Sequence, residues 1–181
     1  MPTKLSPISE PYPDDIAAIL ANYPQQDGYL LKLFRLFANS KRFLLKGMPN
    51  LLDKESPLSM RQREIIILRI TANLGCEYEW GVHITAFAAH VGLSDEQIAA
   101  TKNQPANAAC WPKEESILLA AVDDICTHQR IQPGTYADLC EQLNKEQQLE
   151  LLALCGAYHT VSFIANTTEL ELEPFGARFP T

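Results

Sequence analysis

The 181-residue sequence lacks the segments that mark membrane and secreted proteins. No apolar run approaches the roughly 20 residues that a membrane-spanning helix requires. The N-terminus, MPTKLSPISEPYPDD, has no apolar stretch flanked by basic residues, so it does not resemble a secretion signal. We therefore expect a cytoplasmic protein that has no membrane partner.

Basic residues are also scarce. The chain has 15 Lys and Arg residues against 22 Asp and Glu residues, which gives a formal net charge of -7 and a pI near 5.1. Binding to nucleic acid requires a clustered Lys/Arg surface, and these basic residues do not form one in the sequence. We expect no nucleic-acid partner.

Cysteines are few and isolated. The five cysteines are odd in number and widely spread, with no Cys-x-x-Cys pair: Cys76, Cys110, Cys126, Cys140 and Cys155. Neither a zinc knuckle nor a disulfide framework is indicated. This usage fits a reducing compartment.

No segment shows the period-two alternation of a half-buried strand over a useful length. With 46% hydrophobic residues, the chain is long enough to bury one substantial core. We predict an all-α, single-domain helical bundle of seven to eight helices. A proline-rich extended arm should cover residues 1–13, the helical domain residues 14–170, and an irregular tail residues 171–181.

An early predicted helix, residues 29–38, is too apolar to have a solvent face. It carries Leu31, Phe34, Leu36 and Phe37, and together with the arm it offers more apolar surface than a monomer of this size usually exposes. The sequence thus favours a closed, symmetric homo-oligomer, a dimer, trimer or hexamer.

Chemistry concentrates in residues 58–93. Ser59 and Gln62 have the form of a capping box, and the apolar run that follows predicts a helix as far as Gly75. A second helix should begin at once and stop at Gly92. Two helices joined so tightly must fold back on each other, which would bring Glu64 within reach of His83.

The second helix has one stripe of reactive and aromatic side chains. At about 100° per residue, a single face carries Cys76, Glu79, Trp80, His83, Phe87 and His90. Glu, Cys and His are also possible zinc ligands. However, three ligands on successive turns of one helix are hard to aim at one point, so we expect no metal.

The segment REIIILRITANLGCEYEWGVH resembles the carboxymuconolactone decarboxylase family. In the alkylhydroperoxidase D branch of that family, the first Cys of a Cys-x-x-Cys pair lies twelve positions after a Glu. A His lies four positions after the second Cys. Glu64, Cys76, Glu79 and His83 fall on these positions, and the Tyr78-Glu79-Trp80 triplet is similar to a variant group that has lost the second cysteine. The resemblance implies an all-α, alkylhydroperoxidase D-like fold that forms homo-oligomers.

The departure from the family pattern points to a different chemistry. In the peroxidase branch the second cysteine attacks peroxide, and here Glu79 stands in its place, so a two-cysteine cycle at this motif is impossible. One thiol, two carboxylates and an imidazole are better suited to proton transfer, because burial can tune such groups to titrate near neutral pH. The decarboxylase branch works in this way without metal or organic cofactor.

The sequence therefore predicts a cofactor-free acid–base enzyme acting on a small acidic or lactone-like metabolite. Glu64, Cys76, Glu79 and His83 are the candidate catalytic residues. His83 would deliver a proton, while a neutral Glu79 or Glu64 would stabilise developing enolate charge. Tyr78, Trp80 and Phe87 are the candidate walls of a substrate pocket.

Two alternatives stay open. Cys76 at a helix start could be a low-pKa thiol, because the helix dipole favours thiolate, and the protein would then be a thiol-dependent hydroperoxide reductase. Alternatively, the chain is an oligomeric binding module with a vestigial site. A motif buried without a cavity would indicate the latter.

Overall fold

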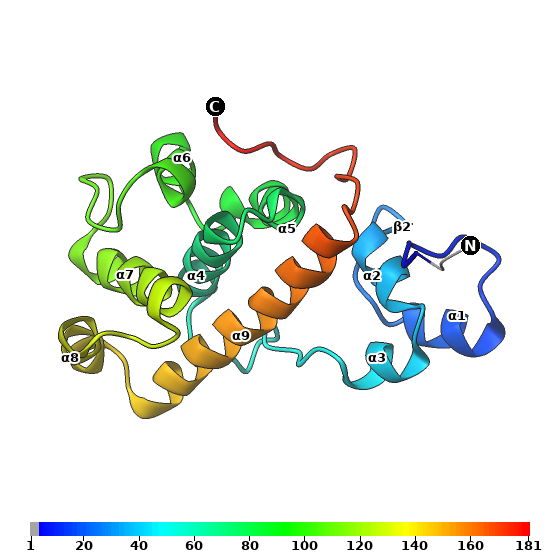
Figure 1. Cartoon of the computed structure of the whole chain (residues 1–181), viewed down its shortest axis with the longest axis horizontal. Coiled ribbons are helices and arrows are strands. Elements are labelled where there is room, and N and C mark those ends of the chain that lie inside the picture. Colours follow the sequence, from blue (N-terminus) through cyan, green and yellow to red (C-terminus); the bar gives the residue numbers. More distant parts are fainter. Residues whose placement is uncertain (1–3) are drawn as a thin grey trace.

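The computed structural model describes residues 4–181, and within them nine α-helices account for most of the secondary structure (Figure 1). The all-α class is confirmed, with slightly more helices than the seven to eight predicted. The helices are α1 (Asp14–Leu20), α2 (Lys32–Phe37), α3 (Lys41–Lys46), α4 (Met60–Asn73), α5 (Glu77–His83), α6 (Asp95–Asn103), α7 (Lys113–His128), α8 (Pro133–Gln142) and α9 (Lys145–Thr167). In the described part of the chain, none of these is both long and apolar enough to cross a bilayer.

Helix α4 is the centre of the fold and packs against α5, α6, α7 and α9 (Figure 1). Its apolar run explains this position, because every residue from Arg63 to Ala72 is buried. Ile66 and Ile70 contribute to a core shared with α7, α8 and α9, whereas Ile65 and Leu68 contribute to a second core with α5 and α6. A helix that is apolar on all sides must be enclosed in this way.

The turn between α4 and α5 follows the sequence signals. The Ser59–Gln62 capping box is formed at the start of α4, and Gly75 has a left-handed φ of 64°, which a residue with a side chain rarely adopts. After His83 the helix continues as a short π-helical segment, Ile84–Ala88, before Gly92 ends it with a φ of 66°. Segments of π-helix are rare and often occur at functional sites.

The N-terminal part differs from the prediction. Tyr29 and Leu30, expected to open a helix, instead form strand β2 (Tyr29–Leu30), which pairs antiparallel with β1 (Gln25–Gln26). Asp27 and Gly28 both have positive φ in the connecting turn, the conformation that Asp-Gly favours between short strands. Helix α2 therefore starts only at Lys32.

The apolar residues of α2 are used inside the chain, so the predicted reason for self-association was wrong. Leu33, Leu36 and Phe37 are buried in a core with α1, α3 and the facing parts of α5 and α9, and Leu31 and Phe34 pack against it. The most exposed large apolar side chains lie elsewhere, and three of them, Leu149, Leu152 and Phe163, are on α9.

The C-terminal tail is irregular, as expected, but it packs closely on α5. The Ala177 N–H donates to the Gly81 carbonyl at 3.1 Å, and the Phe179 and Trp80 ring centroids are 5.2 Å apart. The Glu173 carboxylate is buried and accepts hydrogen bonds from the Tyr29 hydroxyl, the Lys32 N–H and the Tyr78 hydroxyl. The tail thus connects the N-terminal helices to α5.

We predict that Gly81→Ala destabilises the fold by several kcal/mol, because the added Cβ would overlap the Ala177 carbonyl oxygen, a backbone atom that cannot easily move away. Gly134→Ala is the matched control, since a Cβ at this helical glycine meets no atom within 4 Å. It should be neutral or stabilising by up to about 1 kcal/mol. Urea denaturation of both variants measures the difference, and equal midpoints would contradict the close packing of the tail.

Candidate active site

Three helices bring three polar side chains together around His83. His83 Nδ1 lies 2.8 Å from Glu64 Oε2, and Nε2 lies 3.0 Å from Tyr158 Oη and 3.4 Å from Glu79 Oε1. Glu64 comes from the first turns of α4, Glu79 and His83 from α5, and Tyr158 from α9. The predicted proximity of Glu64 and His83 is confirmed.

Local structure explains why these side chains meet. The capping box fixes the start of α4 one turn before Glu64, and the Gly75 turn sends α5 back along α4 so that its last residue, His83, reaches Glu64. Glu79 lies one turn before His83 on the same face. Tyr158 lies in the buried stripe of α9 that includes Leu151, Leu154 and Cys155.

The cluster is almost completely buried, and the two carboxylates determine the protonation state of His83. His83 and Glu64 are each only 3% exposed. Burial by itself lowers the pKa of His83, but the adjacent Glu64 carboxylate, and then Glu79, outweigh it and raise the pKa to about 10. His83 is therefore an imidazolium at neutral pH, and both ring N–H groups donate.

Tyr158 is held in its neutral form. Burial, followed by the nearby charges of Glu79 and Glu64, raises the pKa of this phenol well above its usual value. Because the imidazolium Nε2–H donates to the phenol oxygen, the Tyr158 hydroxyl hydrogen stays available to another acceptor.

Two buried polar atoms of this region lack hydrogen-bond partners among the described residues. One is Glu79 Oε2, the carboxylate oxygen that does not face His83. The other is Nε of Arg63, whose guanidinium otherwise donates to the Leu51 and Asp53 carbonyls. Buried polar atoms are normally paired, so these two retain capacity to bind a ligand.

Cys76 lies beside this cluster at the start of α5, and it is fully buried. Burial raises the pKa of its thiol and the Glu79 charge adds to this, while the Glu79 backbone N–H and the Ser162 hydroxyl act in the opposite direction. The thiolate expected from the helix dipole is therefore not favoured. All five cysteines are free thiols in the described structure.

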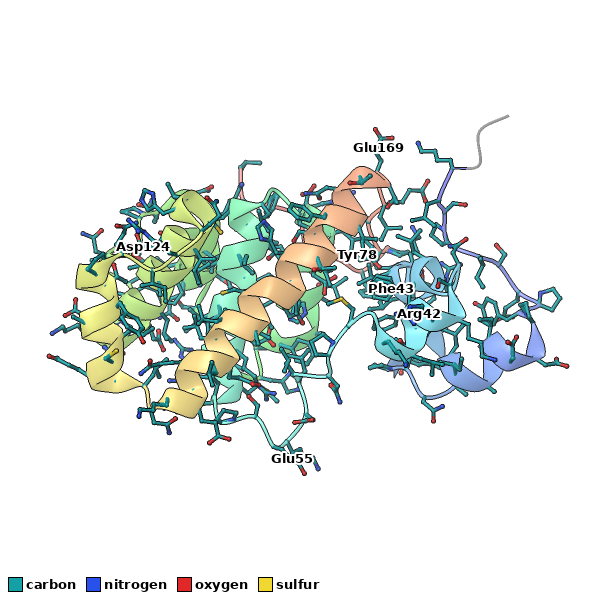
Figure 2. All side chains as sticks on the ribbon, turned by 60° about the horizontal axis from the view of Figure 1, so that its bottom comes forward. Arg42, Phe43, Glu55, Tyr78, Asp124 and Glu169 are labelled. Atoms are coloured by element: carbon teal, nitrogen blue, oxygen red, sulfur yellow. The ribbon has the colours of Figure 1, made fainter. Side chains whose placement is uncertain are left out.

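The three predicted pocket residues point in different directions. The Tyr78 hydroxyl donates to Glu173 and accepts from the Leu33 N–H, at the junction of α9 with the N-terminal helices (Figure 2). Trp80 donates to the Thr101 hydroxyl in the core with α6. Phe87 is partly exposed, and its ring centroid lies 5.3 Å from that of His83. The role of all three in substrate binding stays a prediction.

A model of the carboxymuconolactone decarboxylase family matches residues 42–123, a range that contains α4, α5 and all four predicted catalytic residues. This part of the chain belongs to the carboxymuconolactone decarboxylase family. No curated protein matches it in a comparison of sequences.

Solved structures support the fold over nearly the whole chain. A peroxidase-related protein from Silicibacter sp. TM1040 is 16% identical, with a TM-score of 0.79, covering 99% of this chain and 98% of its own. The debrominase Bmp8 is 13% identical, with a TM-score of 0.78 over 96% and 94%. A peroxidase-related protein with an alkylhydroperoxidase AhpD core from Ralstonia eutropha JMP134 is 17% identical, with a TM-score of 0.75 over 96% and 95%.

Sequence reasoning missed Tyr158 as a member of the cluster around His83. Tyr158 is 75 residues from His83 in the chain, so no local spacing could pair them. The available signal was a hydroxyl-bearing residue in the apolar stripe of α9, since a buried Tyr usually has a hydrogen-bond partner. Arg63 is the first residue of the family-like segment, but its type and position alone did not assign it to the site.

Two cavities lie away from His83. One of about 470 Å³ is beside the N-terminal arm and α2, and one of about 390 Å³ is between α6 and the segment around Cys110. None of the four predicted catalytic residues lines either cavity. Among the described residues, no group of three or more His, Cys, Asp and Glu side chains is arranged to hold a metal ion.

We predict that the charge of His83 makes stability depend on pH. Because the folded pKa is raised above the ordinary 6.5, the contribution is complete below pH 6.5 and is lost as pH rises toward 10. The free energy of unfolding of the wild type, relative to His83→Gln, should fall by several kcal/mol across this range. Denaturation at pH 6, 8 and 10 measures the difference.

Glu64→Gln serves as the control, because it removes the largest interaction that raises this pKa and should move the loss of stability to lower pH. A ¹⁵N spectrum that shows a neutral His83 ring in the wild type at pH 8 would contradict the assignment of an imidazolium.

Proposed function

We propose that the protein is a cofactor-free acid–base enzyme of decarboxylase or lyase type, acting on a small acidic or lactone-like metabolite. The observation that carries the proposal is a buried imidazolium held between two carboxylates, one of which has an oxygen without a partner. This arrangement stores a proton and offers a path by which it can leave. Membership of the carboxymuconolactone decarboxylase family supports the same chemistry.

In the proposed reaction, loss of carbon dioxide leaves an electron pair on carbon, delocalised as an enolate. The Tyr158 hydroxyl, whose hydrogen is available, donates to the enolate oxygen. His83 passes its Nε2 proton to Glu79 Oε1, and rotation of the Glu79 carboxyl group then carries that proton to the side where Oε2 has no partner, from which it is transferred to the carbon. Glu64 stays on Nδ1, where it holds the ring and stabilises the imidazolium when the proton returns.

Arg63 is the proposed partner of the substrate carboxylate. It is buried, its Nε has no partner, and it forms no ion pair among the described residues. It directly precedes Glu64 in α4, and its charge lowers the pKa of Tyr158 against the larger effects that raise it. Arg69 provides the contrast. Its Nε and Nη2 donate to the two carboxylate oxygens of Asp123, at 2.6 and 2.7 Å, so its role is structural.

The thiol-dependent alternative has support from structural relatives. Two of the similar structures are peroxidase-related proteins, and a cysteine-to-alanine variant of the debrominase binds 2,3,4-tribromopyrrole. In this chain, however, the remaining Cys76 is fully buried with a raised thiol pKa, and Glu79 occupies the attacking position. Acid–base chemistry uses His83, Glu79 and Tyr158, whereas thiol chemistry would depend on the buried Cys76 alone.

Access to the cluster must be explained, because the two cavities lie elsewhere and a sealed motif is also what a vestigial site would have. Phe87 is the proposed cover. It is partly exposed, packs on the His83 ring and lies in the π-helical segment. A rotation of its side chain would expose His83 without movement of α4 or α9.

We also propose that the protein forms a homo-oligomer through α9, which crosses the outside of the fold in Figures 1 and 2. The outer stripe of this helix carries Leu149 and Phe163, 69% and 59% exposed, with Leu152, Gly156 and Thr160 between them. The stripe is uncharged, so a second copy can pack on it without like-charge repulsion in a chain of net charge -7.

The catalytic proposal predicts that His83→Gln and Glu79→Gln each lower turnover by roughly 100-fold or more, the usual effect of losing a general acid or base. Cys76→Ser should leave most of the activity. The assay follows carbon dioxide release, and deuterium incorporation at the adjacent carbon by NMR, over a panel of small carboxylic acids and lactones.

The same variants distinguish the thiol alternative when they are assayed with hydrogen peroxide and a dithiol. If Cys76→Ser abolishes a fast peroxide-dependent turnover that His83→Gln and Glu79→Gln leave intact, the thiol is the catalytic group. If the folded wild type has neither activity, and Phe87→Ala does not restore one, the site is vestigial.

Self-association through α9 predicts that Phe163→Glu reduces the oligomer to a species of about 20 kDa in light scattering, because a charge would be buried in the apolar interface. Leu45→Glu, at a similarly exposed leucine of α3, is the control and should not change the mass. A monomeric wild type at micromolar concentration would refute the proposal.

A further inference from the structure

The cavity of about 470 Å³ lies on the N-terminal side of the molecule, away from His83. Its walls come from the N-terminal arm, α1, the β1–β2 hairpin and α2, and include Tyr12, Leu20, Tyr29, Leu30 and Arg35. This volume is in the range of small-molecule sites, which are mostly apolar with a few polar groups that orient the ligand.

Arg35 is the unusual member of this lining. It forms no ion pair with any carboxylate in the described part of the chain, and its Nε is buried without a hydrogen-bond partner. Its guanidinium carbon lies 5.9 Å from the centre of the Tyr29 ring. A buried guanidinium atom without a partner is costly, and its planar fork matches a carboxylate.

The carboxylates of the surroundings do not neutralise Arg35. Glu173, which accepts from the Tyr29 hydroxyl, also accepts from the Lys32 N–H and the Tyr78 hydroxyl, so its oxygens are engaged. Glu10 lines the cavity but is exposed to solvent and lies on the arm. The positive charge at the cavity is thus available to a ligand.

We propose that this cavity binds a small organic monoanion, a carboxylate with an apolar body. The carboxylate pairs with Arg35, while the body packs against Leu20, Leu30 and Tyr12. Inorganic phosphate has no apolar body to pack against these side chains, so it should bind more weakly. The site is separate from the proposed catalytic cluster and does not depend on its chemistry.

The arm that forms one wall is tied to α2. The Ile8 N–H donates to the Arg35 carbonyl at 3.2 Å, and the Asn39 side chain donates to the Ser6 carbonyl at 2.7 Å. The residue that binds the anion therefore also anchors the arm through its backbone, and a side-chain substitution leaves that anchor in place.

The test uses octanoate and benzoate as probes, with octanamide and benzamide as neutral analogues, in calorimetric titrations of the full chain. We expect both carboxylates to bind and the amides to bind at least tenfold more weakly. Arg35→Gln should weaken carboxylate binding at least tenfold, whereas Arg42→Gln, at an exposed arginine on α3, should leave it unchanged. Arg35→Lys, which keeps the charge, should retain part of the affinity.

Circular dichroism checks that the variants are folded, and His83→Gln should bind the probes as the wild type does, so failure of the catalytic proposal would not affect this result. Equal binding of amides and carboxylates, stronger binding of inorganic phosphate, no binding of either carboxylate, or unchanged binding by folded Arg35→Gln would each overturn the proposal.

Discussion

The hydrogen bond between Glu64 and His83 is the interaction on which the arrangement of this molecule depends. It forms only if α4 begins at Ser59, if the chain reverses at Gly75, and if α5 runs back far enough for its last residue to reach the second turn of α4. Helix α9 packs on the same cluster and contributes Tyr158, which contacts the other ring nitrogen of His83. The apolar core around α4 therefore also serves to exclude water from one buried charge pair.

Such a cluster is poorly explained by stability alone. Burying an imidazolium and two carboxylates has a large desolvation cost, and well-packed apolar residues of similar volume often give an equally or more stable core. An unpartnered oxygen on Glu79 and an unpartnered Nε on Arg63 add to this cost. Polar groups in so unfavourable a setting are more readily explained by chemistry, because preorganised charges act most strongly where water is excluded.

The parts of the fold that follow local rules could be predicted from the sequence. The capping box of Ser59 and Gln62 and the left-handed glycines 75 and 92 fixed the ends of the central helices, because caps and positive φ depend on neighbouring residues. The Asp27-Gly28 turn carried an equally local signal that was overlooked. Tyr158 and the tail contact at Gly81 could not be predicted, because they join residues 75 or more positions apart.

Burial disfavours the charged forms of both Cys76 and His83, but the neighbouring carboxylates reverse its effect only at His83. Burial raises the pKa of the Cys76 thiol and the Glu79 charge adds to this, so the thiol stays protonated. His83 has two carboxylates, and for it the same negative charge favours the protonated form. Relative to the Cys-x-x-Cys pattern that this segment resembles, Glu79 has a carboxylate in place of a thiol, and its charge also disfavours ionisation of Cys76. The Glu79 charge that helps to keep the Cys76 thiol protonated also adds to the larger effect of Glu64 in keeping the His83 imidazole protonated.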